Sequence, residues 1–206
     1  YLSKQCDRAS QLDDAKPMNI IKQAKERSEM VIEYSKQKRI PTGFAEIDKL
    51  MYGGLSTVEE LVVIIARTNT GKSWVCTRMM ESAQANGFPV GYYSPEMQSA
   101  FLATRFDTWR GHFQNSQLFR GNYSDEYMEY LRTLAQDETD TYIIEDKDMP
   151  DGVSVRRLET FVKKNHIKLL IVDGISYMTD DNNATEDHKK YKNIAGGLFR
   201  LSKLYG

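Results

Sequence analysis

Cysteine and histidine are scarce in this sequence. Its 206 residues include two cysteines, Cys6 and Cys76, too few and too far apart for a disulfide-stapled scaffold or a zinc site. A reducing cytosolic compartment explains both residues. The three histidines, His112, His166 and His188, are scattered with no spacing typical of metal ligands. The sequence therefore predicts no metal centre built from Cys and His, and we expect these histidines to be surface or packing residues.

Long apolar runs and a surplus of positive charge are also missing. No stretch approaches the roughly 18 apolar residues that a membrane-spanning helix requires, so the composition argues against a membrane protein. The formal net charge is -1, which excludes a protein that coats DNA through bulk positive charge. Any nucleic acid must be held through local contacts. The sequence starts at Tyr1 and has no signal-peptide pattern, so we expect a cytoplasmic protein and a piece of a longer polypeptide.

The chain is long enough for one globular domain with an appended segment. Hydrophobic residues make up 40% and charged residues 28%, as in ordinary globular domains. Residues 17–39 have the pattern of an isolated amphipathic helix, because apolar residues such as Ile20 and Val31 recur near helical spacing. We therefore divide the chain into a linker segment, residues 1–39, and a core domain, residues 40–206.

Strand and helix signals alternate along the core. Short apolar runs rich in β-branched residues are typical of strands buried on both faces of a parallel sheet, and they occur at residues 61–65, 90–93, 142–144 and 169–172. Helical patterns cover residues 72–86, 97–111, 125–136, 154–165 and a last segment from about residue 186. Gly87 is placed to end the first of these helices, and Ser124 and Ser154 to cap later ones. The alternation predicts an α/β fold with parallel strands joined by right-handed crossovers.

A short polar loop lies between the first predicted strand and the first core helix. It ends in Gly71, Lys72 and Ser73, in the register of a phosphate-binding loop. In such a loop the backbone N–H groups and the helix N-terminus bind phosphate, the lysine reaches the β and γ phosphates, and the hydroxyl binds Mg²⁺. We therefore expect ATP and Mg²⁺ as ligands. The predicted loop comprises Ala66, Arg67, Thr68, Asn69, Thr70, Gly71, Lys72 and Ser73.

The apolar run at residues 169–172 ends in Asp173. P-loop proteins use a strand-end carboxylate of this kind to hold the magnesium ion. An Asp at a strand end is also a common turn residue, and the phosphate loop is what favours the functional interpretation. We predict that Asp173 is a magnesium ligand and takes part in catalysis.

Glu96 follows the strand predicted at residues 90–93, within the sequence SPEM at residues 94–97. The carboxyl ends of parallel strands form the edge where ligands bind in open α/β sheets. A carboxylate at this edge can orient and deprotonate the water that attacks a phosphate. A Glu favoured at a helix start by the helix dipole is the alternative that the residues alone leave open.

These motifs, together with two others, resemble the DnaB-type replicative DNA helicases. The two others are TGFAEID at residues 42–48 and GGL at residues 53–55. Ala66, in place of the first glycine of the generic phosphate-loop motif, is usual in that family. The resemblance is collinear over residues 40–206, and the helix predicted at residues 17–39 resembles the linker helix of the family.

The resemblance implies a RecA-like P-loop NTPase core with a mostly parallel sheet, preceded by an amphipathic linker helix. It implies that Lys72, Glu96 and Asp173 are catalytic, with Glu96 as the base and Asp173 as the Walker B acid. It implies that Ser73 and Asp173 hold Mg²⁺ and that Arg105 is a further nucleotide contact.

The same resemblance implies an ATP-hydrolysing DNA helicase. Such a protein works as a homo-oligomer, a hexameric ring that moves along single-stranded DNA and unwinds the duplex. The expected partners are single-stranded DNA, other copies of the chain, a primase and a helicase loader. The expected location is the cytoplasm of a bacterium or of a phage-infected cell.

The chain departs from the family pattern at three places. Residues 174–176 (GIS) follow the Walker B acid where Tyr-Leu-Gln is common, which bears on how DNA couples to that strand. Residues 68–70 (TNT) replace a Pro-Ser-Met type of loop. The sequence also stops where the strand between the phosphate-loop and Walker B strands should begin, and a sheet without it would leave two rows of backbone groups unpaired. We therefore expect the C-terminal part of the core to be missing and the polypeptide to continue.

Other functions stay open at this point. The nearest is another RecA-like ATPase, a recombinase or a KaiC-like regulator. A different class is a nucleotide-gated assembly or loader module with little turnover, against which the complete set of predicted catalytic residues argues. A small-molecule P-loop kinase would need a lid and an acceptor pocket and would not need an acid at Glu96. The sequence has no lid segment.

Overall fold

The computed structural model describes residues 17–205 of the chain. The chain falls into two compact units that divide between Gln37 and Lys38, and each unit is described by itself. Cys6 lies outside the described residues, and so does the prediction made for it. None of the described helices combines the length and the apolar character needed to cross a bilayer.

The first unit contains the described helix α2 (Ala24–Ser35), which is shorter than the helix predicted for residues 17–39. Turns occupy the stretch before it. In this stretch Asn19 Oδ1 accepts from Lys22 N at 2.9 Å, and Gln23 N donates to Asn19 O at 2.8 Å, a side-chain cap on a single turn.

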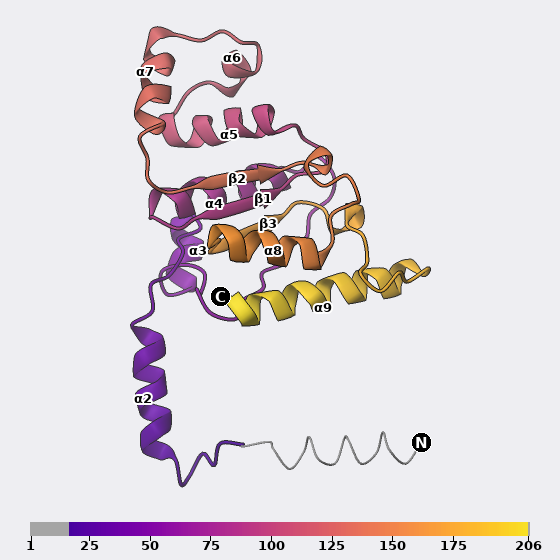
Figure 1. Ribbon diagram of the computed structural model, residues 1–206. Helices are drawn as coiled ribbons and strands as arrows, with labels where there is room; N and C mark the ends of the chain where they lie inside the picture. Colours follow the sequence, from indigo (N-terminus) through magenta and orange to yellow (C-terminus); the bar gives the residue numbers. More distant parts are fainter. Residues whose placement is uncertain (1–16, 206) are drawn as a thin grey trace. The chain divides into compact units, whose positions relative to one another are not determined.

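Three parallel strands form the sheet of the second unit, in the order β2-β1-β3 (Figure 1). They are β1 (Val90–Tyr93), β2 (Thr141–Ile144) and β3 (Leu169–Val172). β1 is the central strand, and its last residue, Tyr93, is paired with Ile144 of β2 and with Val172 of β3. The prediction of an α/β fold with a mostly parallel sheet is therefore confirmed.

Helices cover both faces of this sheet (Figure 1). The helices of this unit are α3 (Ala45–Leu50), α4 (Lys72–Ala85), α5 (Ser99–Gly111), α6 (Asn115–Phe119), α7 (Asp125–Leu134), α8 (Val155–Asn165) and α9 (Asp187–Tyr205), with 3-10 turns η1 (Asp146–Asp148) and η2 (Ile175–Tyr177). Side chains alternate along β1, so Val90 and Tyr92 share a core with α4 and α5, whereas Tyr93 packs with α8 and α9. The longer helices match the predicted segments, and the short α3 and α6 were not predicted.

The predicted strand at residues 61–65 is wrong, because this segment belongs to no strand of the described chain. Four of its five side chains are exposed, from 41% for Leu61 to 92% for Ile65, and Ile64 is half-buried against the core. Residues 61–64 and β3 line the same largely apolar groove of about 520 Å³. An apolar run becomes a strand only when a neighbouring strand takes its backbone hydrogen bonds, and within residues 17–205 no strand lies beside this one.

Serine residues cap the helices only in part as predicted. Ser124 caps α7, since its Oγ accepts from Tyr127 N at 3.2 Å. Ser154 occupies the N-cap position of α8, but its side chain makes no capping hydrogen bond. Asp181 provides the acceptor instead, with its Oδ2 3.1 Å from Arg156 N. The prediction that Ser154 caps this helix is therefore wrong, because a carboxylate from a distant loop takes the role.

Two histidines and a glycine end helices in the left-handed conformation. His112 and His166 are the C-caps of α5 and α8, with φ of 58° and 53°. Gly87 follows α4 with φ of 79°, and its N–H donates to Gln84 O at 2.9 Å. Left-handed residues are common just after helices because they satisfy the last carbonyls. The predicted role of Gly87 is confirmed.

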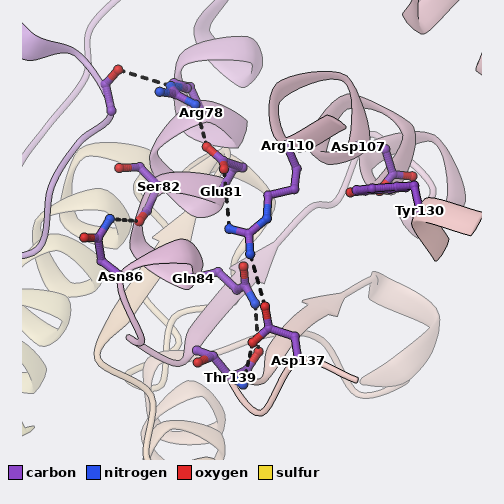
Figure 2. A network of polar contacts seen from close by, with 11 residues as sticks. Arg78, Glu81, Ser82, Gln84, Asn86, Asp107, Arg110, Tyr130, Asp137 and Thr139 are labelled. Atoms are coloured by element: carbon purple, nitrogen blue, oxygen red, sulfur yellow. Dashed lines mark hydrogen bonds and ion pairs between the residues drawn. The ribbon is translucent and has the colours of Figure 1, made fainter. Parts of the chain in front are cut away.

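A chain of charged side chains joins α4 to α5 and to the segment before β2 (Figure 2). The Glu81 carboxylate, 7% exposed, lies between Arg78 Nη1 at 2.5 Å and Arg110 Nη1 at 3.7 Å. Arg110 also donates to Asp137 at 3.1 Å, and Arg78 Nε donates to Gly43 O at 3.1 Å. Two cations offset the cost of removing the Glu81 charge from water. The network therefore holds α4 against its neighbours.

Replacement of Glu81 by Ala is expected to lower the free energy of unfolding by about 2 kcal/mol, because Arg78 and Arg110 lose their shared buried partner. The loss is below that for fully buried pairs, since both guanidinium groups are 27% exposed. Urea unfolding followed by circular dichroism measures it. The control is Glu129→Ala, which removes the exposed pair with Arg132 and should have little effect. Equal losses in the two variants would contradict the structural role of the network.

Candidate active site

The loop at residues 66–71 leads directly into α4, which begins at Lys72. Asn69 and Gly71 have φ angles of 60° and 97°. An added Cβ at Gly71 would meet nothing within 4 Å. The left-handed φ angle, rather than a lack of space, is therefore what favours glycine at this position. These turns bring Lys72 and Ser73 into the first turn of a helix, and helix N-termini bind anions.

The backbone of this loop is available to a ligand. Residues 66–70 are exposed, and within the described chain no group accepts a hydrogen bond from the N–H groups of residues 66–71. Thr70 Oγ1 donates to Arg67 O at 2.7 Å, which closes the loop on itself. A closed loop with unused N–H groups before a helix is the arrangement that phosphate requires.

Asp173 lies at the end of β3, beside the start of α4. Its backbone N–H donates to Tyr93 O at 3.0 Å, and its Oδ1 lies 3.6 Å from Lys72 Nζ. The Lys72 side chain is 41% exposed, whereas the Asp173 side chain is 12% exposed. The carboxylate is therefore held in place, while the ammonium group still reaches solvent.

Tyr92 holds the second oxygen of this carboxylate. Its ring is fully buried, and its Oη donates to Asp173 Oδ2 at 2.9 Å. Burial is the main cause that raises the pKa of Tyr92 far above its ordinary value, and the charges of Cys76 and Asp173 add to it. The Tyr92 hydroxyl therefore stays protonated and orients Asp173, which leaves Oδ1 facing Lys72.

Arg105 on α5 lies close to the start of α4. Its Cζ is 5.0 Å from the centre of the Trp74 ring, and Trp74 packs edge-on against Trp109 with centroids 6.0 Å apart. Burial lowers the pKa of the Arg105 guanidinium, whereas the nearby Tyr92 and Asp173 act in the opposite direction. A cation held over an indole ring in this way is an ordered group, so Arg105 is a second positive charge near the carboxylate.

Glu96 lies on the exposed segment that follows β1. Its Oε1 accepts from Tyr177 Oη at 2.8 Å. Within residues 17–205 no hydrogen bond joins Glu96 to Asp173, but their chain neighbours Pro95 and Gly174 are close, since a Cβ added to Gly174 would lie 3.6 Å from Pro95 Cγ. The structure therefore brings Glu96 to the same edge of the sheet as the Walker B candidate.

The oxygen donors of this region suit a hard cation. Ser73 offers a hydroxyl in the first turn of α4, and Asp173 offers a carboxylate beside Lys72. Magnesium typically takes one or two protein oxygens and completes its shell with phosphate and water. Over residues 17–205 no group of three or more His, Cys, Asp or Glu side chains could form an all-protein cage. The residues fit a magnesium ion that arrives together with a phosphate ligand.

Three aromatic residues of this region were not singled out from the sequence, namely Trp74, Tyr92 and Tyr177. Each lies within four positions of a predicted site residue along the chain. That proximity is the signal that could have found them. A tyrosine or tryptophan next to a motif is otherwise read as a strand or core residue.

The Cys76 thiol is expected to react slowly. Burial, together with the charge of Asp173, raises its pKa to about 11, so only about one thiol in a thousand is ionised at pH 8. Because the folded pKa is the higher one, the thiol contributes stability below about pH 9, which is lost as the pH rises toward about 11.

Iodoacetamide alkylation of Cys76, read by peptide mass spectrometry, should therefore keep rising through pH 10 in the folded protein. In urea the rate should level off at lower pH. The Asp173→Asn variant should shift the folded profile to lower pH, because it removes a negative charge that disfavours the thiolate. A plateau near pH 9 in the folded protein would contradict this environment for Cys76.

The chain matches known proteins in family and in fold. Residues 39–204 match the family model described as DnaB-like helicase C terminal domain. A solved structure described as an ATPase domain has a TM-score of 0.73 and 16% identity, over 92% of this chain and 68% of that one. A comparison with curated protein sequences finds no significant match.

A second similar structure is that of a DnaB-like replicative helicase, described with its interactions with primase. It has a TM-score of 0.74 and 16% identity, over 98% of this chain and 50% of that one, so the present chain spans half the length of that protein. The two structures share the RecA-like α/β fold with this chain, in agreement with the three-stranded parallel sheet. By its match over residues 39–204, the chain belongs to the DnaB-like helicase C-terminal domain family.

Proposed function

We propose that this chain is the ATPase motor of a replicative DNA helicase, which hydrolyses ATP in a ring of like subunits, moves along single-stranded DNA and unwinds the duplex. The observation that carries the proposal is the 3.6 Å distance between Lys72 Nζ and Asp173 Oδ1 at the start of α4. In a chain of the DnaB-like family, this pair supports a phosphate-loop lysine beside a Walker B acid.

ATP binds with its phosphates against the loop at residues 66–71 and the first turn of α4. The unused N–H groups of the loop and the partial positive charge of the helix N-terminus favour the anion. Lys72 is exposed enough to turn from Asp173 toward the β and γ phosphates. Ser73 and Asp173 would hold Mg²⁺, which supplies positive charge to the phosphoryl oxygens when bound. Arg105 is a further nucleotide contact in this proposal.

Glu96 acts on the attacking water. The water oxygen forms a bond to the γ phosphorus, the bond to the β–γ bridging oxygen breaks, and its electron pair leaves with ADP. Glu96 orients the water and accepts its proton, effects worth about 10² to 10⁴ in rate. Tyr92 keeps its hydrogen bond to Asp173 and so holds that acid in one orientation during the reaction.

DNA and protein partners follow from the same proposal. With a net charge of -1, each subunit of the ring need supply only a few phosphate contacts to a single strand. The helix α2 docks on a neighbouring subunit in this proposal. The description of one similar structure includes interactions with primase, and we include a primase and a helicase loader among the partners. The location is the cytoplasm of a bacterium or of a phage-infected cell.

The proposal also includes a further strand of the RecA-like core. The groove between residues 61–64 and β3 is lined largely by apolar side chains, as for a strand buried on both faces. Such a strand would pair with β3 on one side and with residues 61–65 on the other, which satisfies both rows of backbone groups. A crossover through α9 would bring the chain from β3 to that place.

ATP turnover by the full-length protein, measured with and without single-stranded DNA, tests the motor function. DNA should raise kcat, and Glu96→Gln should lower turnover by about 100-fold or more while ATP binding is retained. Glu129→Gln, a matched substitution on an exposed face of α7, should change neither. Turnover that is absent or indifferent to DNA would instead favour a nucleotide-gated assembly module or a KaiC-like regulator. DNA-stimulated turnover with strand exchange and no unwinding would favour a recombinase.

A further inference from the structure

Tyr177 makes a contact with the proposed base that the motor function does not yet use. Its Oη donates to Glu96 Oε1 at 2.8 Å. Within residues 17–205, Tyr177 is the residue that hydrogen-bonds this carboxylate. The bond raises the pKa of the Tyr177 hydroxyl, and the charge of Glu96 adds to the rise, so the group remains a donor at neutral pH.

The segment that carries Tyr177 is anchored at both of its ends. On one side, Asp173 N donates to Tyr93 O at 3.0 Å as β3 ends. On the other side, Met178 is fully buried in the core beneath α8 and α9, and Thr179 N donates to Val153 O at 2.8 Å. The backbone that carries Tyr177 is therefore held, while its ring is 50% exposed.

Gly174 allows this segment to turn back toward Glu96. Its φ is 115°, a left-handed value that glycine adopts without strain. A Cβ at this position would lie 3.1 Å from Tyr177 Cδ2, so the turn also brings the backbone against the tyrosine ring.

The segment that carries Glu96 is anchored as well. Ser94 is buried, its Oγ donates to Met97 O at 2.9 Å, and Met97 N donates back to Ser94 Oγ at 3.3 Å. The next residues are held by Ser99 N, which donates to Glu145 Oε1 at 2.8 Å. With both backbones held, the remaining freedom at the site is the rotation of the exposed Glu96 and Tyr177 side chains, which their hydrogen bond restricts.

We propose that Tyr177 is a positioning residue for Glu96, an inference that rests on the proposed function of Glu96 as the base. The Tyr177 hydroxyl donates a hydrogen bond to Oε1 and so fixes the orientation of the carboxylate. Oε2 is then left to accept the proton of the attacking water. Asp173 and Tyr177 lie on one short segment, which therefore carries both the proposed magnesium ligand and the support of the base.

The test is the Tyr177→Phe variant of the full-length protein, which removes one hydroxyl and keeps the ring. ATP turnover at saturating DNA should show kcat reduced roughly tenfold, as for other partners that orient a reacting group, with KM unchanged. The control is Tyr205→Phe, which removes a comparable bond to Glu159 of 3.0 Å and should change neither value.

The double variant Tyr177→Phe with Glu96→Gln separates positioning from a structural effect. If Tyr177 acts through Glu96, the double variant should turn over ATP at the same rate as Glu96→Gln alone. An additional loss in the double variant, or a Tyr177→Phe protein with the kcat of the wild type, would overturn the inference while Glu96→Gln still supports the base. Full turnover by Glu96→Gln would contradict the base itself, and the inference with it.

Discussion

The parallel pairing of β3 with β1 is the contact on which the candidate site depends. It aligns Tyr93 with Val172, so the segments that leave the two strands emerge at the edge where ligands bind in open α/β sheets. Asp173 leaves β3 at this edge, and Glu96 follows β1. The pairing also lets the Tyr92 hydroxyl of one strand reach the carboxylate that ends the other. A shift of one residue along β1 would turn Tyr92 to the opposite face and break that contact.

A helix, rather than a strand, holds the phosphate loop in this structure. Residues 61–65 lack a strand partner in the described chain, so they cannot position the loop that follows them. α4 is held instead by Met80 and Ala83, which are fully buried in the core, and by the Glu81 carboxylate between its two arginines. This packing explains why Lys72 lies beside Asp173 even though the segment before the loop is exposed. In the described chain, β3 is an edge strand of the sheet, and the groove lies along it.

Local patterns predicted most elements, and the errors occurred where the outcome depended on distant residues. The runs at 61–65 and 169–172 have the same apolar character, yet only the second has a partner strand. Lys72 and Asp173 could be predicted because their motifs require particular residue types. Tyr92 could not, because a tyrosine in a strand is ordinary and its role depends on a hydrogen bond to another strand. Arg105 became a candidate only through the family resemblance.

Nucleotide binding to the full-length protein tests the central claim, which is that the Lys72 and Asp173 pair forms the phosphate site. Binding of a fluorescent ATP analogue is titrated with and without Mg²⁺ for the wild type, Lys72→Ala, Asp173→Asn and the surface control Arg132→Ala. The account predicts a loss of about tenfold or more for Lys72→Ala, equivalent to about 1.4 kcal/mol, and a loss of the magnesium dependence for Asp173→Asn. Binding by Lys72→Ala as tight as that of the wild type would contradict it.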